Sequence, residues 1–347
     1  MSAPVVVKLG SSLIVGPRGR VRRSVLQSRA REIATVVRGG SPVCVVSSGA
    51  IALGLSRLGL DRRPRSLPKL QAASALGQAR LQRAWEEALA AEDLAAAQIL
   101  LTASDVADRA AYVNAGNTLR ALFALGAVPI VNENDATATD EITFGDNDAL
   151  AAQVAVLVRA RLLILLTEVE GVYTHAPGTP GAELVGEGGR VRDAVLGGTS
   201  GFGRGGMQSK VLAAEMAAVA GIPTVIAAGT GSSVLGPLID GDARGTRFQA
   251  APQALPAYKL WLRFGKPVAA RLHVDEGALR AVAEGGRSLL AVGVVSCEGS
   301  FEVGDAVELV APSGAVFGKG IAAAVHDEIA SRARGVEAVH RDRLVVY

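Results

Sequence analysis

Two clusters of amide and carboxylate side chains lie close together in the middle of the chain. The first, Asn132–Asp135 (Asn-Glu-Asn-Asp), follows the apolar run Val128–Val131, and the second, Gly145–Asp148 (Gly-Asp-Asn-Asp), precedes an apolar helical stretch. A packed core does not tolerate such groups without partners, so together they suit a small ligand that carries both an ammonium and a carboxylate group. A pair of polar turns is the alternative, because Asn, Asp and Gly favour turns.

Two further loops contain residues that suit an anion. Lys8–Ser12 (Lys-Leu-Gly-Ser-Ser) ends the first apolar run, and its glycine would let a phosphate approach the backbone. Val46–Ile51 (Val-Ser-Ser-Gly-Ala-Ile) ends the second run and leads into a helix, whose N-terminal amides attract anions. The alternatives are a lysine at the surface end of a strand and an ordinary serine N-cap. The spacing of a Walker A loop is absent.

A third loop, Ser200–Lys210, is rich in glycine and places a lysine in the first turn of the next helix, where it could reach nucleotide phosphates. Thr167 and Glu168 follow the most apolar strand, although this segment could also form a hairpin with no ligand. The four histidines do not cluster, and no Ser/His/Asp set is spaced convincingly, so nucleophilic catalysis and a structural zinc site are disfavoured. Two lysines, glycine loops and carboxylates are typical of phosphoryl transfer by positioning and charge neutralisation.

Short apolar runs alternate with helical stretches up to Phe248, which predicts parallel strands covered on both faces. We therefore predict an α/β fold, a three-layer αβα sandwich, whose strand ends would bring the loops together. The predicted strands are Val5–Lys8, Val43–Val46, Ala97–Leu101, Val128–Val131, Leu162–Leu166 and Thr224–Ala227. The predicted helices are Ser24–Arg38, Lys69–Ala91, Tyr112–Leu125, Asp148–Val158 and Met207–Ala220.

The pattern changes after Phe248. Residues 249–257 are rich in Ala and Pro and carry no charge, which predicts a linker between a first domain at 1–248 and a second at 258–347. Glycine-punctuated β runs dominate the second domain and predict a small β-barrel-like fold. The predicted strands there are Leu289–Val295, Ala306–Leu309 and Leu344–Tyr347.

Composition limits the classes of function. Aromatic residues make up 4% of the 347 residues, which disfavours an aromatic platform for single-stranded nucleic acid. The net charge of +3 is mild, and the two cysteines have no metal-ligand spacing. The N-terminus has no signal-peptide pattern, and the most apolar stretch, Ala149–Leu166, is interrupted by two arginines. We expect a soluble, cytoplasmic protein with no membrane span.

Taken in order, these motifs resemble the amino acid kinase family over essentially the whole chain. The Asn-Glu-Asn-Asp and Gly-Asp-Asn-Asp pair is the most specific part, because it separates the branch that acts on L-glutamate from its relatives. The tail resembles a PUA domain. The residues that carry the resemblance are Val7–Ser12, Ser48–Ile51, Asn132–Asp135, Gly145–Asp148 and Gly205–Lys210 in the first domain, and Gly304–Val307, Gly318–Ile321 and Val339–Asp342 in the tail.

The resemblance implies transfer of the ATP γ-phosphoryl group to the side-chain carboxylate of L-glutamate, which gives L-glutamyl 5-phosphate and opens proline biosynthesis. By the same resemblance Lys8 and Lys210 would neutralise the moving phosphoryl group, and Asp148 would hold both lysines. The residues implied in binding glutamate are Ser48, Gly49, Asn132, Asp135, Asp146 and Asn147. Those implied in binding ATP are Lys8, Gly10, Thr167, Glu168, Arg204, Gly205, Gly206, Met207, Gln208, Ser209 and Lys210.

The resemblance also implies Mg²⁺ on the ATP phosphates with no all-protein metal site, proline as a feedback inhibitor, and a homo-oligomer. Two positions depart from the family pattern: Glu168 stands where Asp is usual, and Arg204 stands where a small polar residue is usual. Arg204 could contact a phosphate or point into solvent.

Two other functions compete with this interpretation. A sibling kinase for another acid would keep the fold but not the two Asn/Asp clusters. An RNA-binding protein would use the PUA-like tail, but residues 258–347 hold eleven Lys or Arg and eleven Asp or Glu, a net charge of zero. RNA binding is therefore disfavoured, because neutralisation of phosphates supplies much of its affinity.

Overall fold

A computed structural model describes residues 2–60, 62–137, 147–188, 191, 206–252 and 255–347. The chain forms two compact units, Met1–Ala254 and Leu255–Tyr347. The predicted linker at 249–257 spans the division between them, and its exact limits stay a prediction. No helix among the described residues has the length and apolar character needed to cross a bilayer.

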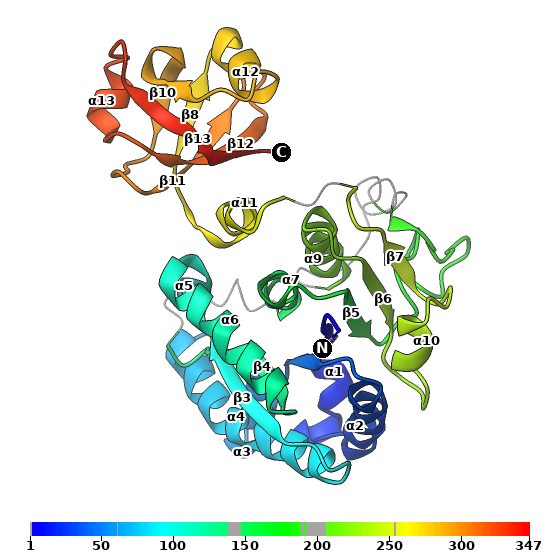
Figure 1. Ribbon diagram of the computed structural model, residues 1–347. Coiled ribbons are helices and arrows are strands. Elements are labelled where there is room, and N and C mark those ends of the chain that lie inside the picture. Colours follow the sequence, from blue (N-terminus) through cyan, green and yellow to red (C-terminus); the bar gives the residue numbers. More distant parts are fainter. Residues whose placement is uncertain (1, 61, 138–146, 189–190, 192–205, 253–254) are drawn as a thin grey trace. The chain divides into compact units, whose positions relative to one another are not determined.

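A seven-stranded sheet forms the centre of the first unit (Figure 1), in the order β3-β4-β2-β1-β5-β6-β7. All neighbouring strands from β3 to β6 run parallel, so their carboxyl ends meet at one edge. The strands are β1 Val5–Leu9, β2 Val43–Ser47, β3 Ala96–Leu101, β4 Val128–Glu133, β5 Leu162–Thr167, β6 Thr224–Ala228 and β7 Thr246–Phe248. All six predicted strands are present, each shifted by at most two residues at either end.

Helices cover both faces of this sheet, so the predicted three-layer sandwich is confirmed (Figure 1). Val5, Val7 and Leu9 of β1 face a buried apolar cluster shared with α2, α3, α4 and α10. The alternate residues of β1, Val6 and Lys8, face the other layer, because side chains alternate along a strand. The first layer is α2 Arg23–Arg38, α3 Ala50–Arg57, α4 Leu67–Ala90 and α10 Leu235–Ile239, and the second is α6 Arg109–Ala124, α7 Asn147–Val158 and α9 Met207–Val219.

Short elements complete the first unit. They are α1 Ser11–Ile14, the 3₁₀ turn η1 Pro17–Gly19, and α5 Ala103–Ala107, which begins with a capping box between Thr102 and Asp105. The prediction missed β7, an antiparallel edge strand of only three residues that pairs with β6. A segment this short shows no alternation by which a sequence pattern could find it.

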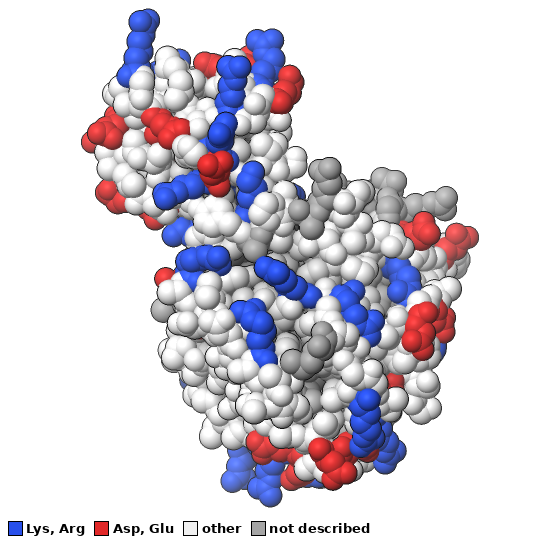
Figure 2. All heavy atoms as spheres, viewed as in Figure 1, with Lys and Arg blue, Asp and Glu red and all other residues white. Residues whose placement is uncertain are grey.

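The second unit is a small β-rich domain, as predicted. Its six-stranded sheet has the order β10-β8-β11-β12-β13-β9 and encloses a separate apolar core. The elements are α11 Ala257–Leu260, the π turn η3 Trp261–Gly265, β8 Val268–Val274, α12 Glu276–Ala283, β9 Leu289–Leu290, η4 Ala291–Gly293, β10 Val294–Glu298, β11 Ala306–Val310, β12 Val316–Ala322, α13 His326–Ala330 and β13 Glu337–Val346. Lysine, arginine and acidic side chains are interspersed on the visible face of this unit (Figure 2).

One predicted strand of this domain was wrong. The run Leu289–Val295 is not one strand but two, β9 and β10, separated by the 3₁₀ turn at Ala291–Gly293. The turn carries the chain from one edge of the sheet, where β9 pairs with β13, to the other, where β10 pairs with β8. Gly293 permits this path, because a Cβ atom there would lie 2.6 Å from the Cβ of Ala278. Because the run is apolar throughout, its sequence pattern does not reveal this change from one edge of the sheet to the other.

Candidate active site

Three charged side chains meet beneath the carboxyl edge of the sheet. Lys8 comes from the central strand β1, Asp148 from the first turn of α7, and Lys210 from the first turn of α9. The Nζ of Lys8 lies 2.5 Å from one Asp148 oxygen, and the Nζ of Lys210 lies 2.9 Å from the other. The sequence separates these residues by up to 202 positions, and the fold brings them together.

Burial makes this arrangement electrostatically strong. The side chains of Lys8, Asp148 and Lys210 are 5%, 1% and 10% exposed. Burial alone would raise the pKa of the Asp148 carboxyl, but the two ammonium groups outweigh burial and lower that pKa to about 2. One carboxylate therefore serves two cations, and the cluster keeps a net positive charge. The alternative of a surface lysine at the end of β1 is wrong.

The start of α9 adds hydroxyl and carbonyl groups to this cluster. The Ser209 hydroxyl lies 3.0 Å from Asp148 Oδ2, and the Lys210 ammonium donates to the Gly206 carbonyl at 3.4 Å. Met207 is buried and Gln208 is exposed in the same turn. An anion at this helix start would meet the free backbone amides of α9 as well as the two lysines.

A cavity of about 340 Å³ opens beside the cluster, on the β1-β2-β4 side of the sheet. Its polar wall includes Ser48, Asn147, Asn132 and Asp135. Ser48 is held by its amide, which donates to the Leu9 carbonyl at 3.2 Å, and its hydroxyl accepts from the Asn147 amide at 2.9 Å. Five of the six predicted substrate residues, from the ends of β2 and β4 and the start of α7, therefore line one cavity.

The helix after β2 does not use a serine cap. Its N-cap is Gly49, with a left-handed φ of 114°, and no side chain in the described part of the chain caps it by a hydrogen bond. The alternative of an ordinary Ser48 N-cap is therefore wrong. Because Ser48 is left available, its hydroxyl can line the cavity, and the free N-terminal amides of α3 lie beside it.

Two residues of α4 hold the side chains that line the cavity, and no sequence motif pointed to either of them. The Ser74 hydroxyl donates to Asp135 Oδ2 at 2.6 Å, and Gln78 Oε1 accepts from the Asn132 amide at 2.8 Å. Asp135 is 7% exposed, and burial raises the pKa of its carboxyl, although the Ser74 hydrogen bond and the Arg63 charge oppose this. The carboxylate is thus poised to gain from a cation in the cavity.

Close packing of two helices fixes those α4 residues. Gly54 of α3 lies against the backbone of α4, since a Cβ atom there would be 1.7 Å from the Ala73 carbonyl oxygen. Gly77 of α4 reciprocates, since its Cβ would be 1.7 Å from the Ala50 carbonyl oxygen. This contact joins the start of α3 to the turn that carries Ser74. The glycine in each helix, Gly54 and Gly77, is the sequence signal that could have indicated this close approach.

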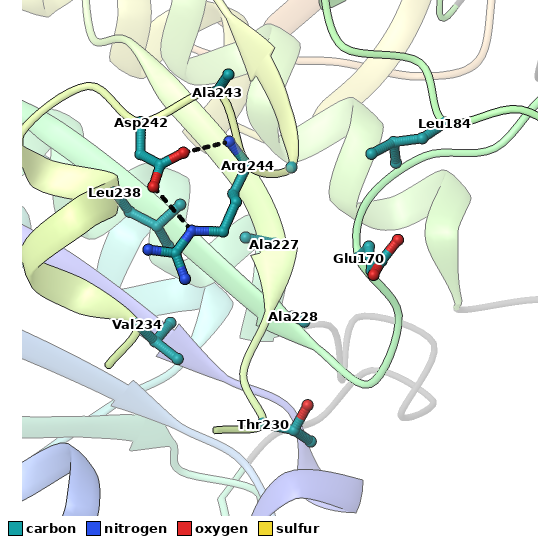
Figure 3. Close-up of a pocket in the computed structure, with 11 residues that line it drawn as sticks. Glu170, Leu184, Ala227, Ala228, Thr230, Val234, Leu238, Asp242, Ala243 and Arg244 are labelled. Atoms are coloured by element: carbon teal, nitrogen blue, oxygen red, sulfur yellow. Dashed lines mark hydrogen bonds and ion pairs between the residues drawn. The ribbon is translucent and has the colours of Figure 1, made fainter. Parts of the chain in front are cut away.

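A second cavity of about 430 Å³ lies on the β5-β6-β7 side of the sheet. Thr167 ends β5, and its carbonyl accepts from Gly229 at 2.7 Å, while the exposed Glu168 begins the segment that leads to the cavity wall. Glu170 and Leu184 lie across the cavity from the hydrogen-bonded pair Asp242 and Arg244 (Figure 3). The Gly171 turn does continue into a bridge between Tyr173 and Leu184, as the hairpin alternative expected.

An ion pair beneath this cavity holds its wall. The Arg29 side chain, 1% exposed, lies 2.8 Å from Glu32 and donates to the Gly231 carbonyl. Glu32 in turn accepts from the backbone amides of Val234, at 2.7 Å, and Leu235. Through these bonds α2 fixes the loop that enters α10. No motif in the sequence points to Arg29 or Glu32.

Other predicted residues fall into two groups. Gly10, Gly49 and Gly206 lie at the starts of α1, α3 and α9. Asp146, Arg204 and Gly205 lie outside the described residues.

Within the described ranges, no three His, Cys, Asp or Glu side chains form a group that could hold a metal ion. Three histidines each lie close to one acidic side chain, for example His273 at 2.9 Å from Glu298. Asp148 is the carboxylate of the three-residue cluster, and both of its oxygens face lysines. This donor set does not fit an all-protein cage for Mg²⁺.

Comparison with known proteins agrees with the geometry. The sequence profile of the amino acid kinase family matches residues 3–228, and that of the PUA domain matches residues 270–342. A protein from Citrifermentans bemidjiense named glutamate 5-kinase is 41% identical, covering 99% of this chain and 97% of its own length. One from Sphingopyxis alaskensis with the same name is 46% identical, covering 91% of this chain and 86% of its own.

A solved structure supports the same fold. The carbamate kinase of Giardia superimposes with a TM-score of 0.53 at 17% sequence identity, over 72% of this chain and 99% of its own. At that identity the likeness concerns the fold alone.

Proposed function

Because this chain belongs to the amino acid kinase family, we infer that it transfers the γ-phosphoryl group of ATP to the side-chain carboxylate of L-glutamate. The product is an acyl phosphate, L-glutamyl 5-phosphate, and the reaction is the first step of proline biosynthesis. Similarity over nearly the full length to proteins named glutamate 5-kinase supports this substrate.

The shared carboxylate of Asp148 carries the mechanistic part of the proposal. Two anions must approach each other in this reaction, and the transition state spreads negative charge over the moving phosphoryl oxygens. We assign Lys8 and Lys210 to neutralise that charge, since both ammonium groups are desolvated and fixed in advance. Asp148 positions them and keeps two buried cations tolerable before ATP arrives.

We assign the 340 Å³ cavity to L-glutamate. Asp135 would pair with the α-ammonium group, because burial disfavours its charged form and a nearby cation would offset that cost. Asn132, Asn147 and Ser48 would orient the substrate by hydrogen bonds, and Gly49 would let it approach the backbone. The side-chain carboxylate would then point toward Lys8, past Ser11 and Asn147, which both line the cavity.

We assign the cavity on the β5-β6-β7 side of the sheet to ATP. The 430 Å³ cavity has an apolar floor of Ala227, Val234 and Leu238 that suits a nucleoside base. We assign Thr167 and Glu168, which precede the lining residue Glu170, to the nucleotide as well, and the phosphates would run toward the start of α9. The assigned residues there are Gly10, Arg204, Gly205, Gly206, Met207, Gln208, Ser209 and Lys210. Bound Mg²⁺ would neutralise further phosphate charge, and ATP itself would supply its ligands.

Three finer points belong to the same proposal. Proline shares an α-carboxylate and an amine with glutamate, so we propose that it inhibits by occupying the same cavity. Glutamate saturation curves that do not move in millimolar proline would contradict this. We also propose a homo-oligomer, to be tested by light scattering, and a cytoplasmic location, where both substrates are made.

A hydroxylamine trap tests the function directly. Hydroxylamine converts an acyl phosphate to a hydroxamate, so the protein is incubated with Mg-ATP and glutamate, aspartate, N-acetylglutamate or UMP. We expect hydroxamate with glutamate only, together with an equal amount of ADP. Hydroxamate with another acid would move the substrate and keep the mechanism. Neither hydroxamate nor ADP from any acceptor would refute the kinase assignment.

A further inference from the structure

Arg63 brings a positive charge to the wall of the glutamate cavity. It lies in the loop between α3 and α4, and it lines the cavity together with Asp135 and Glu133. Among the described residues that line this cavity, Arg63 is the only cation. Neither the motifs of the sequence nor the resemblance to the family pointed to it.

The charges of the substrate require such a group. L-Glutamate carries one ammonium and two carboxylate groups. If Asp135 takes the ammonium and the two lysines take the side-chain carboxylate, the α-carboxylate has no counter-charge. It is bonded to the same carbon as the ammonium group, so it must lie close to Asp135. Two protein carboxylates, Asp135 and Glu133, would repel it there.

Arg63 lies where that repulsion has to be offset. Its charge acts on the Asp135 carboxyl, opposing the burial that raises the pKa of that group. Because Arg63 and Asp135 line one cavity, a substrate paired with Asp135 through its ammonium group would bring its α-carboxylate to the wall that Arg63 helps to form. Arginine presents a planar fork that matches a carboxylate with two parallel hydrogen bonds.

We propose that Arg63 binds the α-carboxylate of the acceptor and makes the enzyme select amino acids in which that carboxylate is free. The inference rests on the proposed function, because it presumes that glutamate occupies this cavity. Two other sources of positive potential compete with it. The N-terminal amides of α3, at Ala50 and Ile51, line the same cavity. The exposed neighbours Arg62 and Arg65 could attract anions from a distance.

Measuring two acceptors with each of four enzymes separates these possibilities. The acceptors are L-glutamate and its α-carboxamide, L-isoglutamine, which keeps the ammonium and side-chain carboxylate groups. The enzymes are wild type, Arg63→Gln, Arg63→Lys and the matched control Arg62→Gln, an exposed neighbour that does not line the cavity. The readout is kcat/KM for ADP release at two salt concentrations.

We expect wild type to prefer glutamate over isoglutamine by about 10- to 100-fold, the range of a charge-assisted hydrogen bond. Arg63→Gln should reduce that preference to roughly threefold or less, mainly through the KM for glutamate, with the KM for ATP unchanged. Arg63→Lys should give an intermediate preference, because one ammonium replaces a two-pronged contact. Arg62→Gln should keep the wild-type preference.

Two results would overturn the inference. An unchanged preference in Arg63→Gln would assign the α-carboxylate to the amides of α3. Equal, salt-sensitive losses in Arg62→Gln and Arg63→Gln with both acceptors would indicate a long-range field with no contact. Failure of the proposed function would look different, because wild type would then release no glutamate-dependent ADP.

Discussion

Replacing Asp148 by asparagine should destabilise the first unit severely while leaving its shape intact. Asparagine matches aspartate in size but cannot neutralise the two ammonium groups that share this carboxylate. Lys8 and Lys210 would then be two buried cations that have lost the carboxylate they share. Removal of one partner from a buried ion pair costs roughly 3–5 kcal/mol.

The lowered pKa of Asp148 indicates a contribution of similar order. Lowered from 3.8 to about 2, it corresponds to about 2 kcal/mol of stability, taking 1.36 kcal/mol for each pKa unit. Because the pKa is lower in the folded state, this contribution is complete above pH 3.8 and is lost as the pH falls toward 2. At neutral pH it is therefore fully present in wild type and absent in Asp148→Asn.

The assay is urea unfolding followed by the fluorescence of one tryptophan. Of the two tryptophans, Trp85 is buried in α4 of the first unit and Trp261 belongs to the second. In a Trp261→Phe background, the signal from Trp85 reports on the first unit alone. The matched control is Asp108→Asn, at an exposed N-cap of α6 where asparagine caps as well as aspartate.

We expect a loss of at least about 2 kcal/mol for Asp148→Asn and less than about 0.5 kcal/mol for Asp108→Asn. The difference should shrink as the pH falls toward 2, because wild type then loses its own contribution from Asp148. Adding Lys210→Met to Asp148→Asn should recover part of the stability, because it removes one unpaired charge. A single-variant loss below about 1 kcal/mol, independent of pH, would refute the view that this carboxylate neutralises buried charge.

Four further variants probe the rest of the site. Lys8→Ala and Lys210→Ala should each lower kcat at least ~100-fold, and near-normal turnover in both would contradict their assigned role. Asp135→Asn should be no less stable than wild type at pH 7.5, since burial raises the pKa of Asp135 and ionisation is costly there. That advantage should fade at lower pH, and the KM for glutamate should rise about 10-fold or more. Glu32→Gln should raise the KM for ATP and not that for glutamate, because Glu32 holds the Val234 amide at the wall of the nucleotide cavity. An equal change in both KM values would indicate general disorder.

The strands and most helices of the first unit could be predicted from the sequence, because their signals are local. An apolar run of five or six residues between turn residues identifies a buried parallel strand, and each predicted strand of the first unit exists. Lys8 and Asp148 could be assigned a role because they lie next to such runs. A helix was also expected to follow Val46–Ile51, where α3 lies, but the sequence pattern set no bounds for it.

The supporting contacts could not be predicted, because they depend on packing between distant segments. Ser74 lies in the middle of an alanine-rich helix, and nothing near it indicates that it reaches Asp135, 61 residues away. Arg29 has the same difficulty, since its partner at Gly231 is 202 residues away. An arginine in the N-terminal half of an amphipathic helix is ordinarily a surface residue. Only the assembled layers show that this one is buried.

The order of the strands explains why two substrates can meet at Lys8. From β1 the chain moves first to β2 and β4 on one side, and later to β5 and β6 on the other. The loops at the carboxyl ends therefore diverge on either side of β1, which leaves a crevice where open α/β sheets bind ligands. One cavity lies on each side of that point, and Lys8 lies on the strand between them. If each cavity serves one substrate, changes on one side should alter the KM of that substrate alone. Changes at the central lysines should instead alter kcat, because both substrates meet the same charges there.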